Sequence, residues 1–140
     1  MENRRTFLAL AAALLPIGIE PQTAAQAPAA ARPGGDLARH TLTGAFEGFE
    51  AVLTEVALPT GQPNPTNRAH RHSGFVLGYV LEGRLRFAID NQPERIVPTG
   101  GTFFEPIGAL HSANGATSDG PVRFLAFLVV PKGSPVVVPA

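Results

Sequence analysis

Three of the four histidines in this chain stand at positions that suit a metal site. His70 and His72 are separated by one residue, so on a β-strand they share one face, about 6.5–7 Å apart along the backbone. Two imidazoles held in this way can bind one metal ion when a third ligand arrives from another strand. His111 is the ligand that the sequence offers for this role. The spacing therefore predicts a metal site built on strands.

The composition limits which chemistry is available. The chain has 140 residues, which suits one compact domain, and it has no cysteine. Disulfides, thiolate metal sites and thiol nucleophiles are therefore excluded, and any metal must be held by nitrogen and oxygen ligands. Lys and Arg together number 11, as do Asp and Glu, so the formal net charge is zero. This balance predicts no binding to nucleic acid or to an anionic membrane surface.

Residues 1–31 have the pattern of a removable export signal. Arg4 and Arg5 precede the short apolar segment 8–19, and the small-residue segment 23–31 follows. The paired arginines resemble the bacterial twin-arginine type of signal. A retained membrane anchor is the alternative, but the apolar segment is shorter than the ~20 residues that a spanning helix needs. We expect a periplasmic or otherwise exported protein with no membrane association once the signal is removed.

The rest of the chain has the pattern of short strands. Its segments are β-branched or aromatic, end at glycine or proline, and have no sustained helical period. Many such strands with regularly spaced turns predict a single all-β domain, a sandwich or barrel. The expected strands are Glu50–Leu58, Phe75–Leu81, Arg84–Ile89, Glu94–Val97, Thr102–Glu105 and Val122–Val130.

Three other segments are expected to lie outside these strands. Residues 32–39 are interpreted as a flexible lead-in, and residues 114–121 as a loop. The tail 132–140 contains prolines and valines, and it either frays or adds to a sheet edge between two chains.

The histidines and the glycines around them resemble the two motifs of the cupin superfamily. His70, His72 and Gly83 match part of the first motif, Gly-x5-His-x-His-x3–4-Glu-x6-Gly. The second motif, Gly-x5-Pro-x-Gly-x2-His-x3-Asn, is matched through its histidine, while Asn114 comes one residue early. The resemblance covers residues 40–131 and implies a cupin-type jelly-roll β-barrel with a metal inside, paired as a homodimer. The positions that match the second motif are Gly100, Pro106, Gly108 and His111.

One position departs from the cupin pattern. Val76 stands where the glutamate of the first motif is expected, and a valine cannot bind a metal. We therefore hypothesise that Glu105, the acid nearest to the second motif, replaces the missing carboxylate as a metal ligand or as a partner of a ligating histidine. The alternative is that Glu105 points outward and is solvated. Gly78, two residues after Val76 on the same face, is expected to leave a gap in the interior.

The resemblance implies one divalent transition metal: iron, manganese, nickel, copper or zinc. Its ligands are expected to be His70, His72 and His111, with Glu105 as the candidate fourth. The leading functional hypothesis is a metal-dependent enzyme, dioxygenase-like or isomerase-like, acting on a small organic molecule. Its rival is a periplasmic binding module that is not catalytic and uses the metal to capture a small-molecule ligand or for stability. A vestigial site in a structural protein is the third hypothesis.

Seven aromatic residues on the expected strands have two interpretations. They can line an aromatic substrate pocket, or they can fill the barrel core, which is the more common use of aromatics on alternating strands. The core interpretation is favoured. These residues are Phe75, Tyr79, Phe87, Phe103, Phe104, Phe124 and Phe127.

Overall fold

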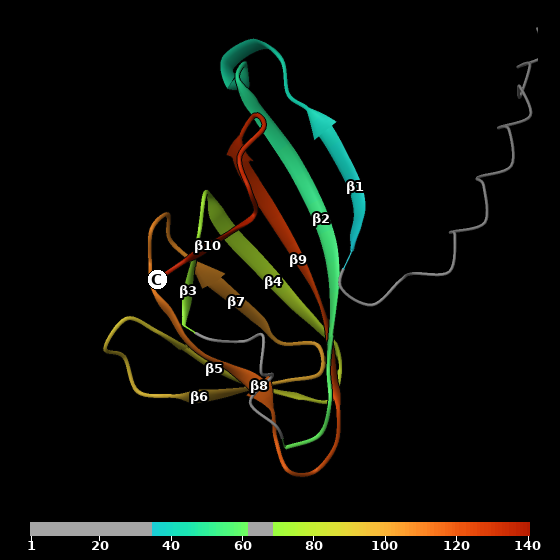
Figure 1. Cartoon of the computed structure of the whole chain (residues 1–140). Coiled ribbons are helices and arrows are strands. Elements are labelled where there is room, and N and C mark those ends of the chain that lie inside the picture. The colour runs from blue at the N-terminus through green and yellow to red at the C-terminus, as the bar shows by residue number, and fades with distance from the viewer. Residues whose placement is uncertain (1–34, 62–68) are drawn as a thin grey trace, which may run out of the picture.

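Two five-stranded antiparallel sheets form the protein, and their inner faces share one apolar core (Figure 1). The computed structural model describes residues 35–61 and 69–140. Sheet A has the strand order β1-β2-β9-β4-β7, and sheet B has the order β10-β3-β8-β5-β6. The all-β jelly-roll prediction is confirmed. The elements are β1 (Asp36–Thr41), the short 3-10 helix η1 (Gly44–Phe46), β2 (Phe49–Leu58), β3 (His70–His72), β4 (Phe75–Glu82), β5 (Arg84–Ile89), β6 (Arg95–Pro98), β7 (Thr102–Glu105), β8 (His111–Ala116), β9 (Val122–Pro131) and β10 (Val137–Pro139).

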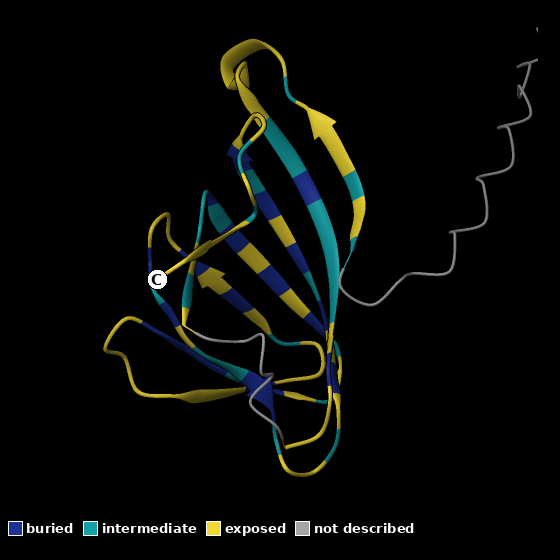
Figure 2. Cartoon of the chain, viewed as in Figure 1, coloured by how far each residue is buried: buried dark blue, intermediate teal, exposed yellow. Residues whose placement is uncertain are grey.

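Sheet A is built on long regular ladders. Strands β2 and β9 pair over ten residues, from Phe49 opposite Pro131 to Leu58 opposite Val122. Alternate residues of β9 are buried, as Figure 2 shows by its bands along this strand. This alternation is the strand period of two, with one face on the core and the other facing outward. Sheet A therefore presents a rigid inner wall to sheet B.

Phe103 fills the space beside Gly78 that the sequence was expected to leave empty. The two residues face each other across the β4–β7 ladder. A Cβ atom added at Gly78 would lie 2.0 Å from the ring of Phe103, so the glycine leaves room for the ring. The same ring lies 4.8 Å from that of Phe87 and 5.5 Å from that of Phe124, measured between centroids. The prediction of a gap is therefore wrong, because an aromatic ring occupies this space.

The seven aromatic residues divide between the two faces of the sheets. Phe87, Phe103 and Phe124 are buried, so the core interpretation is right for these three. Tyr79, Phe104 and Phe127 lie on the outer face of sheet A and are 47%, 51% and 38% exposed. Phe75 is half-buried between Phe104 and Phe127.

Two terminal segments are more ordered than the sequence predicted. The prediction of a flexible lead-in is wrong for residues 36–39, because β1 pairs with β2. The side chain of Arg39 also donates hydrogen bonds to Asp36 and Glu50. The tail is not frayed, because β10 pairs with β3 of the same chain.

The expected loop 114–121 begins later than predicted. Residues 114–116 belong to β8 and not to a loop, since they pair with β5.

The expected export signal, residues 1–31, lies outside the described residues. Within residues 35–61 and 69–140, no helix has the length and apolar character needed to cross a bilayer.

Candidate metal centre

The short strand β3 carries the first two histidines. His70 and His72 are half-buried on one face of β3, as the strand period predicts, and Arg71 between them is exposed. The guanidinium of Arg71 donates a hydrogen bond to the carbonyl of Gly108. The Nε2 atoms of His70 and His72 lie 3.2 Å apart. Two nitrogens bound to one metal at about 2.1 Å are separated by about 2.9–3.4 Å, depending on the bond angle. The pair thus has the spacing that one ion requires.

The third histidine comes from the neighbouring strand. His111 begins β8 and pairs directly with His70 across the β3–β8 ladder. It is 3% exposed, and its ring lies 5.2 Å from that of Phe87 between centroids. One nitrogen from each of His70, His72 and His111 lies within 4.8 Å of the other two. The three histidines that the sequence singled out therefore converge.

A bulge in β8 turns a further polar residue into the same space. Opposite β5, the pairing moves from Ala88–Ala113 to Ile89–His111, so β8 contains one extra residue. His111 and Asn114 would face opposite sides of a regular strand, yet both line the cavity described below. The displaced motif asparagine was visible in the sequence, but its place in the cavity depends on the bulge.

Glu105 points inward and stands opposite the valine that interrupts the cupin pattern. It ends β7, is 2% exposed, and pairs with Val76 across the β4–β7 ladder. Directly opposed residues on one face of a sheet have Cβ atoms about 4.5–5.5 Å apart. A carboxylate at 105 therefore reaches the region that a glutamate at 76 would occupy. The solvated interpretation of Glu105 is wrong.

The carboxyl group of Glu105 faces two of the histidines. Its Oε1 lies 3.3 Å from His111 Nδ1, and its Oε2 lies 3.6 Å from His72 Nε2. Glu105 Oε2 and His111 Nε2 are buried and have no hydrogen-bond partner among the described residues. Buried polar atoms normally have partners, and a cation shared by these atoms would satisfy them. The residues therefore suit a bound metal cation.

Burial keeps the metal-free site close to neutral. It raises the pKa of Glu105 to about 8. Burial also lowers the pKa of His111 to about 3, and the neighbouring His70 and His72 act in the same direction. The pKa of His72 is lowered chiefly by burial. At neutral pH, His72 and His111 are therefore unprotonated and able to donate lone pairs, while Glu105 holds a proton that a bound cation would displace.

An apolar cavity of about 350 Å³ adjoins the histidines between the two sheets. Its lining contains no lysine and no arginine among the described residues, and its only carboxyl groups are Glu105 and Asp36. Thr54 and Asn114 add polar atoms. The cavity suits a small molecule that is mostly apolar and carries few polar groups. The apolar residues of its wall include Val56, Leu58, Phe103, Phe124, Leu128 and Val136.

The comparison with known families identifies the fold. The Cupin domain family matches residues 55–130, which is more than half of the chain and includes all four candidate metal ligands. The chain belongs to the cupin family. A comparison with curated protein sequences found no significant match.

Solved structures resemble this cupin at low sequence identity. A cupin protein from Bacteroides fragilis is 22% identical with a TM-score of 0.50, and the alignment covers 81% of this cupin and 90% of that chain. The FeII form of HppE in complex with substrate is 24% identical with a TM-score of 0.45, covering 58% of this chain and 45% of that one. The DMSP lyase DddQ from Ruegeria pomeroyi is 18% identical with a TM-score of 0.48, covering 74% and 51%. The first similarity supports the fold, and none of the three transfers a reaction to this cupin.

The site of this cupin includes one contributor that the sequence did not indicate. The backbone carbonyl of Val136 accepts a hydrogen bond from His72 Nδ1 at 3.0 Å. Because the interaction uses a main-chain atom of a distant segment, no side-chain pattern could have predicted it.

Proposed function

We propose that this cupin is a metal-dependent enzyme, of the oxygenase or isomerase type, acting on a small and largely apolar organic molecule. One observation carries the proposal. Three imidazoles and a buried carboxyl group converge at one apolar cavity, with His111 and Glu105 almost completely buried. Such a donor set suits a divalent transition metal and does not select among iron, manganese, nickel, copper and zinc.

Each protein group has a defined part in this proposal. His70, His72 and His111 hold the metal, which when bound supplies Lewis acidity or redox chemistry. Glu105 either completes the ligand set or holds a proton beside His72 and His111, since its pKa of about 8 lies near neutrality. The rings of Phe103 and Phe124 exclude water from one side of the site and shape the cavity.

The lining of the cavity favours a neutral substrate. The described lining residues provide no cation to neutralise a carboxylate or phosphate far from the metal. Thr54 and Asn114 suit a hydroxyl, carbonyl or amine on the same molecule. Small phenols and diketones have these properties, and a volume of about 350 Å³ is within the usual range for ligand pockets.

Oxygen consumption and product analysis test this function. The metal-loaded cupin is mixed with a panel of phenols and diketones in an oxygen electrode, and the products are identified. Uptake of oxygen indicates an oxygenase, whereas conversion without uptake indicates an isomerase. The Glu105→Gln variant is assayed in the same way. Glu94→Gln is its matched control, because Glu94 is in a surface ion pair with Arg86. If substrates bind to the metal-replete protein but never turn over, the enzyme proposal is wrong and the binding module replaces it.

Export and homodimer formation are also proposals. The twin-arginine pattern at Arg4 and Arg5 supports export to the periplasm. The exposed apolar outer face of sheet A, next to the edge strand β7, supports pairing with a second copy. Fractionation of cells that express the full chain, with and without Arg4→Lys and Arg5→Lys, tests export. Failure of the double variant to change localisation would contradict it.

A further inference from the structure

The C-terminal segment 132–139, called the strap here, ends in β10, the edge strand of sheet B beside the candidate metal centre. After β9 ends, the chain turns at Gly133, whose φ of 77° is in the left-handed region that glycine adopts easily. It then returns along β3 as β10, with Val137 opposite His72 and Pro139 opposite His70. The strap lies beyond residues 55–130, the part of the chain that the Cupin domain family matches.

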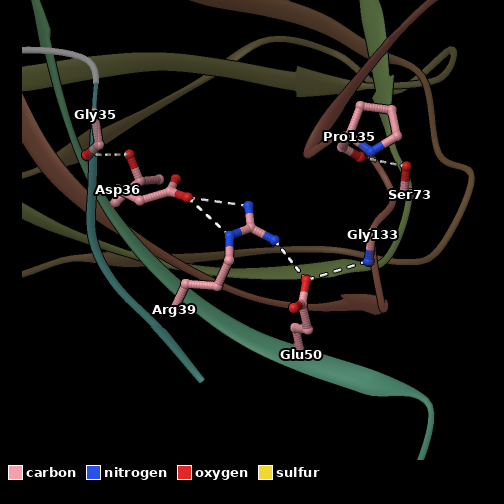
Figure 3. A network of polar contacts seen from close by, with 8 residues as sticks. Gly35, Asp36, Arg39, Glu50, Ser73, Gly133 and Pro135 are labelled. Carbon is pink, nitrogen blue, oxygen red and sulfur yellow. Dashed lines mark hydrogen bonds and ion pairs between the residues drawn. The ribbon is translucent and has the colours of Figure 1, made fainter. Parts of the chain in front are cut away.

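An ion-pair network holds the first residues of the strap in place (Figure 3). Arg39 bonds to Asp36 on its own strand and to Glu50 on β2, at 3.0 Å and 2.8 Å. The same carboxylate oxygen of Glu50 accepts a hydrogen bond from the backbone N–H of Gly133 at 3.3 Å. The backbone N–H of Lys132 adds a hydrogen bond to the carbonyl of Gly48 at 2.8 Å. Strands β1 and β2 of sheet A thus set where the strap begins.

Ser73 attaches the middle of the strap to the histidine strand. Its hydroxyl donates a hydrogen bond to the carbonyl of Pro135 at 2.5 Å, a contact that Figure 3 also shows. Its backbone N–H donates to the carbonyl of Val136 at 3.4 Å. Because Ser73 directly follows His72, these two bonds hold the strap at the point where the ligand strand ends.

The strap then contacts His72 itself. The carbonyl oxygen of Val136 can only accept, so the ring of His72 must carry its proton on Nδ1 to make the 3.0 Å hydrogen bond. With Nδ1 protonated, the lone pair of the neutral ring is on Nε2, which faces His70 Nε2 and the carboxyl group of Glu105. The side chains of Val136 and Val137 also line the cavity.

We propose that the strap is a positioning element, which selects the metal-binding tautomer of His72 through the backbone carbonyl of Val136 and closes one wall of the cavity. The inference about metal affinity rests on the proposed function, while the tautomer can be measured in the metal-free protein. Loss of a hydrogen-bond partner of a ligating histidine usually weakens metal binding 10- to 100-fold. The strap, which lies outside the residues that the family matches, therefore contributes to the metal affinity of the site.

Truncation with two measurements tests this proposal. A chain ending at Ser134 is compared with a matched control ending at Val138, which keeps the Val136 carbonyl and the Val137–His72 pairing. In the first chain, we expect zinc affinity, measured by chelator competition, to fall 10- to 100-fold. We also expect ¹⁵N–¹H correlation spectra of the metal-free protein to show His72 losing its fixed Nδ1–H tautomer. The control should stay within about twofold of the full chain, and the exposed His40 is the internal reference.

The two measurements separate the possible failures. If the chain ending at Ser134 keeps both its affinity and the Nδ1–H tautomer of His72, the strap proposal is wrong. If the full chain binds no zinc, the metal site fails, yet the tautomer comparison still decides whether the strap orients His72.

A full-length variant covers the case in which the truncated chain does not fold. Val138→Pro removes a backbone donor from the β3–β10 pairing while every side chain of the site is retained. We expect it to populate both tautomers of His72 and to bind zinc several-fold more weakly. An unchanged tautomer in Val138→Pro, with a circular dichroism spectrum like that of the parent, would also overturn the proposal.

Discussion

The two sheets contribute to the candidate site in different ways. Sheet B provides three imidazoles from β3 and β8, whereas sheet A provides one carboxyl group from β7. The histidine strand β3 has three residues and a single paired position with β8. Glu105 instead ends a β7 ladder of four paired positions with β4, which itself pairs with the long strand β9. His70 and His72 are thus on a strand with less support from its own sheet than Glu105 has, whereas His111 is on β8, which pairs with β5.

This difference explains why the site needs a segment from outside the shared domain. A carboxyl group on a long ladder is placed by the strand period and by packing, so Glu105 needs no further support. An imidazole on a three-residue strand can rotate about its side-chain bonds, and the hydrogen bond from His72 Nδ1 to Val136 restricts that rotation. Sheet A thus holds Glu105 in place through its ladders, whereas His72 of sheet B is oriented by a further hydrogen bond.

The largest effect is expected from the sheet B donors. His70→Ala combined with His72→Ala should abolish stoichiometric metal binding, because only one imidazole remains. Both side chains are half-buried on a short strand, so the β-rich circular dichroism spectrum should be retained. Elemental analysis after dialysis measures the metal. A double variant that retains one metal per chain would mean that the ion binds elsewhere.

The sheet A donor should have a smaller effect, and its position can be exchanged. Glu105→Val should lower metal affinity by about 10- to 100-fold, the usual range for a supporting carboxylate. Adding Val76→Glu returns a carboxylate to the opposite position of the same ladder and should restore most of the affinity. Chelator competition measures both variants. Equal affinities of the parent and Glu105→Val would remove Glu105 from the site.

The buried carboxyl group should also make the stability of the metal-free protein depend on pH. The pKa of Glu105 is raised from 4.5 to about 8, so the folded state holds a proton that the unfolded chain has lost. Its stabilising contribution is complete below pH 4.5 and is lost as the pH rises through 8. Relative to Glu105→Gln, the parent should lose on the order of 3 kcal/mol of unfolding free energy over this range.

Urea titrations of both proteins with a chelator present measure this difference. His111 has the opposite sign, because its pKa is lowered from 6.5 to about 3 and its contribution is lost as the pH falls. It is present in both proteins and cancels in the comparison. Stability curves that run parallel from pH 4.5 to 8 would show that Glu105 titrates normally.

The smallest effect on the site is expected from the outer face of sheet A. Phe104 precedes Glu105 on β7 and points the opposite way, with half of its surface exposed. Phe104→Ser should leave metal affinity within about twofold and weaken self-association in sedimentation experiments. A changed metal affinity would mean that the two faces of β7 are coupled. An unchanged mass in solution would exclude this face as the dimer contact.

The sequence predicted the fold and the donors because both depend on local patterns. Short β-branched and aromatic segments bounded by glycine or proline predicted six strands, β2, β4, β5, β6, β7 and β9, to within one residue, and the histidine spacing predicted the cluster. The inward direction of Glu105 could also have been read from the period of two, since it shares a face with the buried Phe103. The bulge that turns Asn114 inward and the docking of the strap could not. Both depend on pairing between segments distant in sequence.

In the proposed site, His70, His72, His111 and Glu105 hold one divalent transition metal. Elemental analysis of the protein, purified without an affinity tag, tests this site. We expect one transition metal ion per chain in the parent and none in the variant with His70→Ala and His72→Ala. A parent protein with no bound transition metal, and no uptake when zinc or iron is supplied in slight excess, would contradict it.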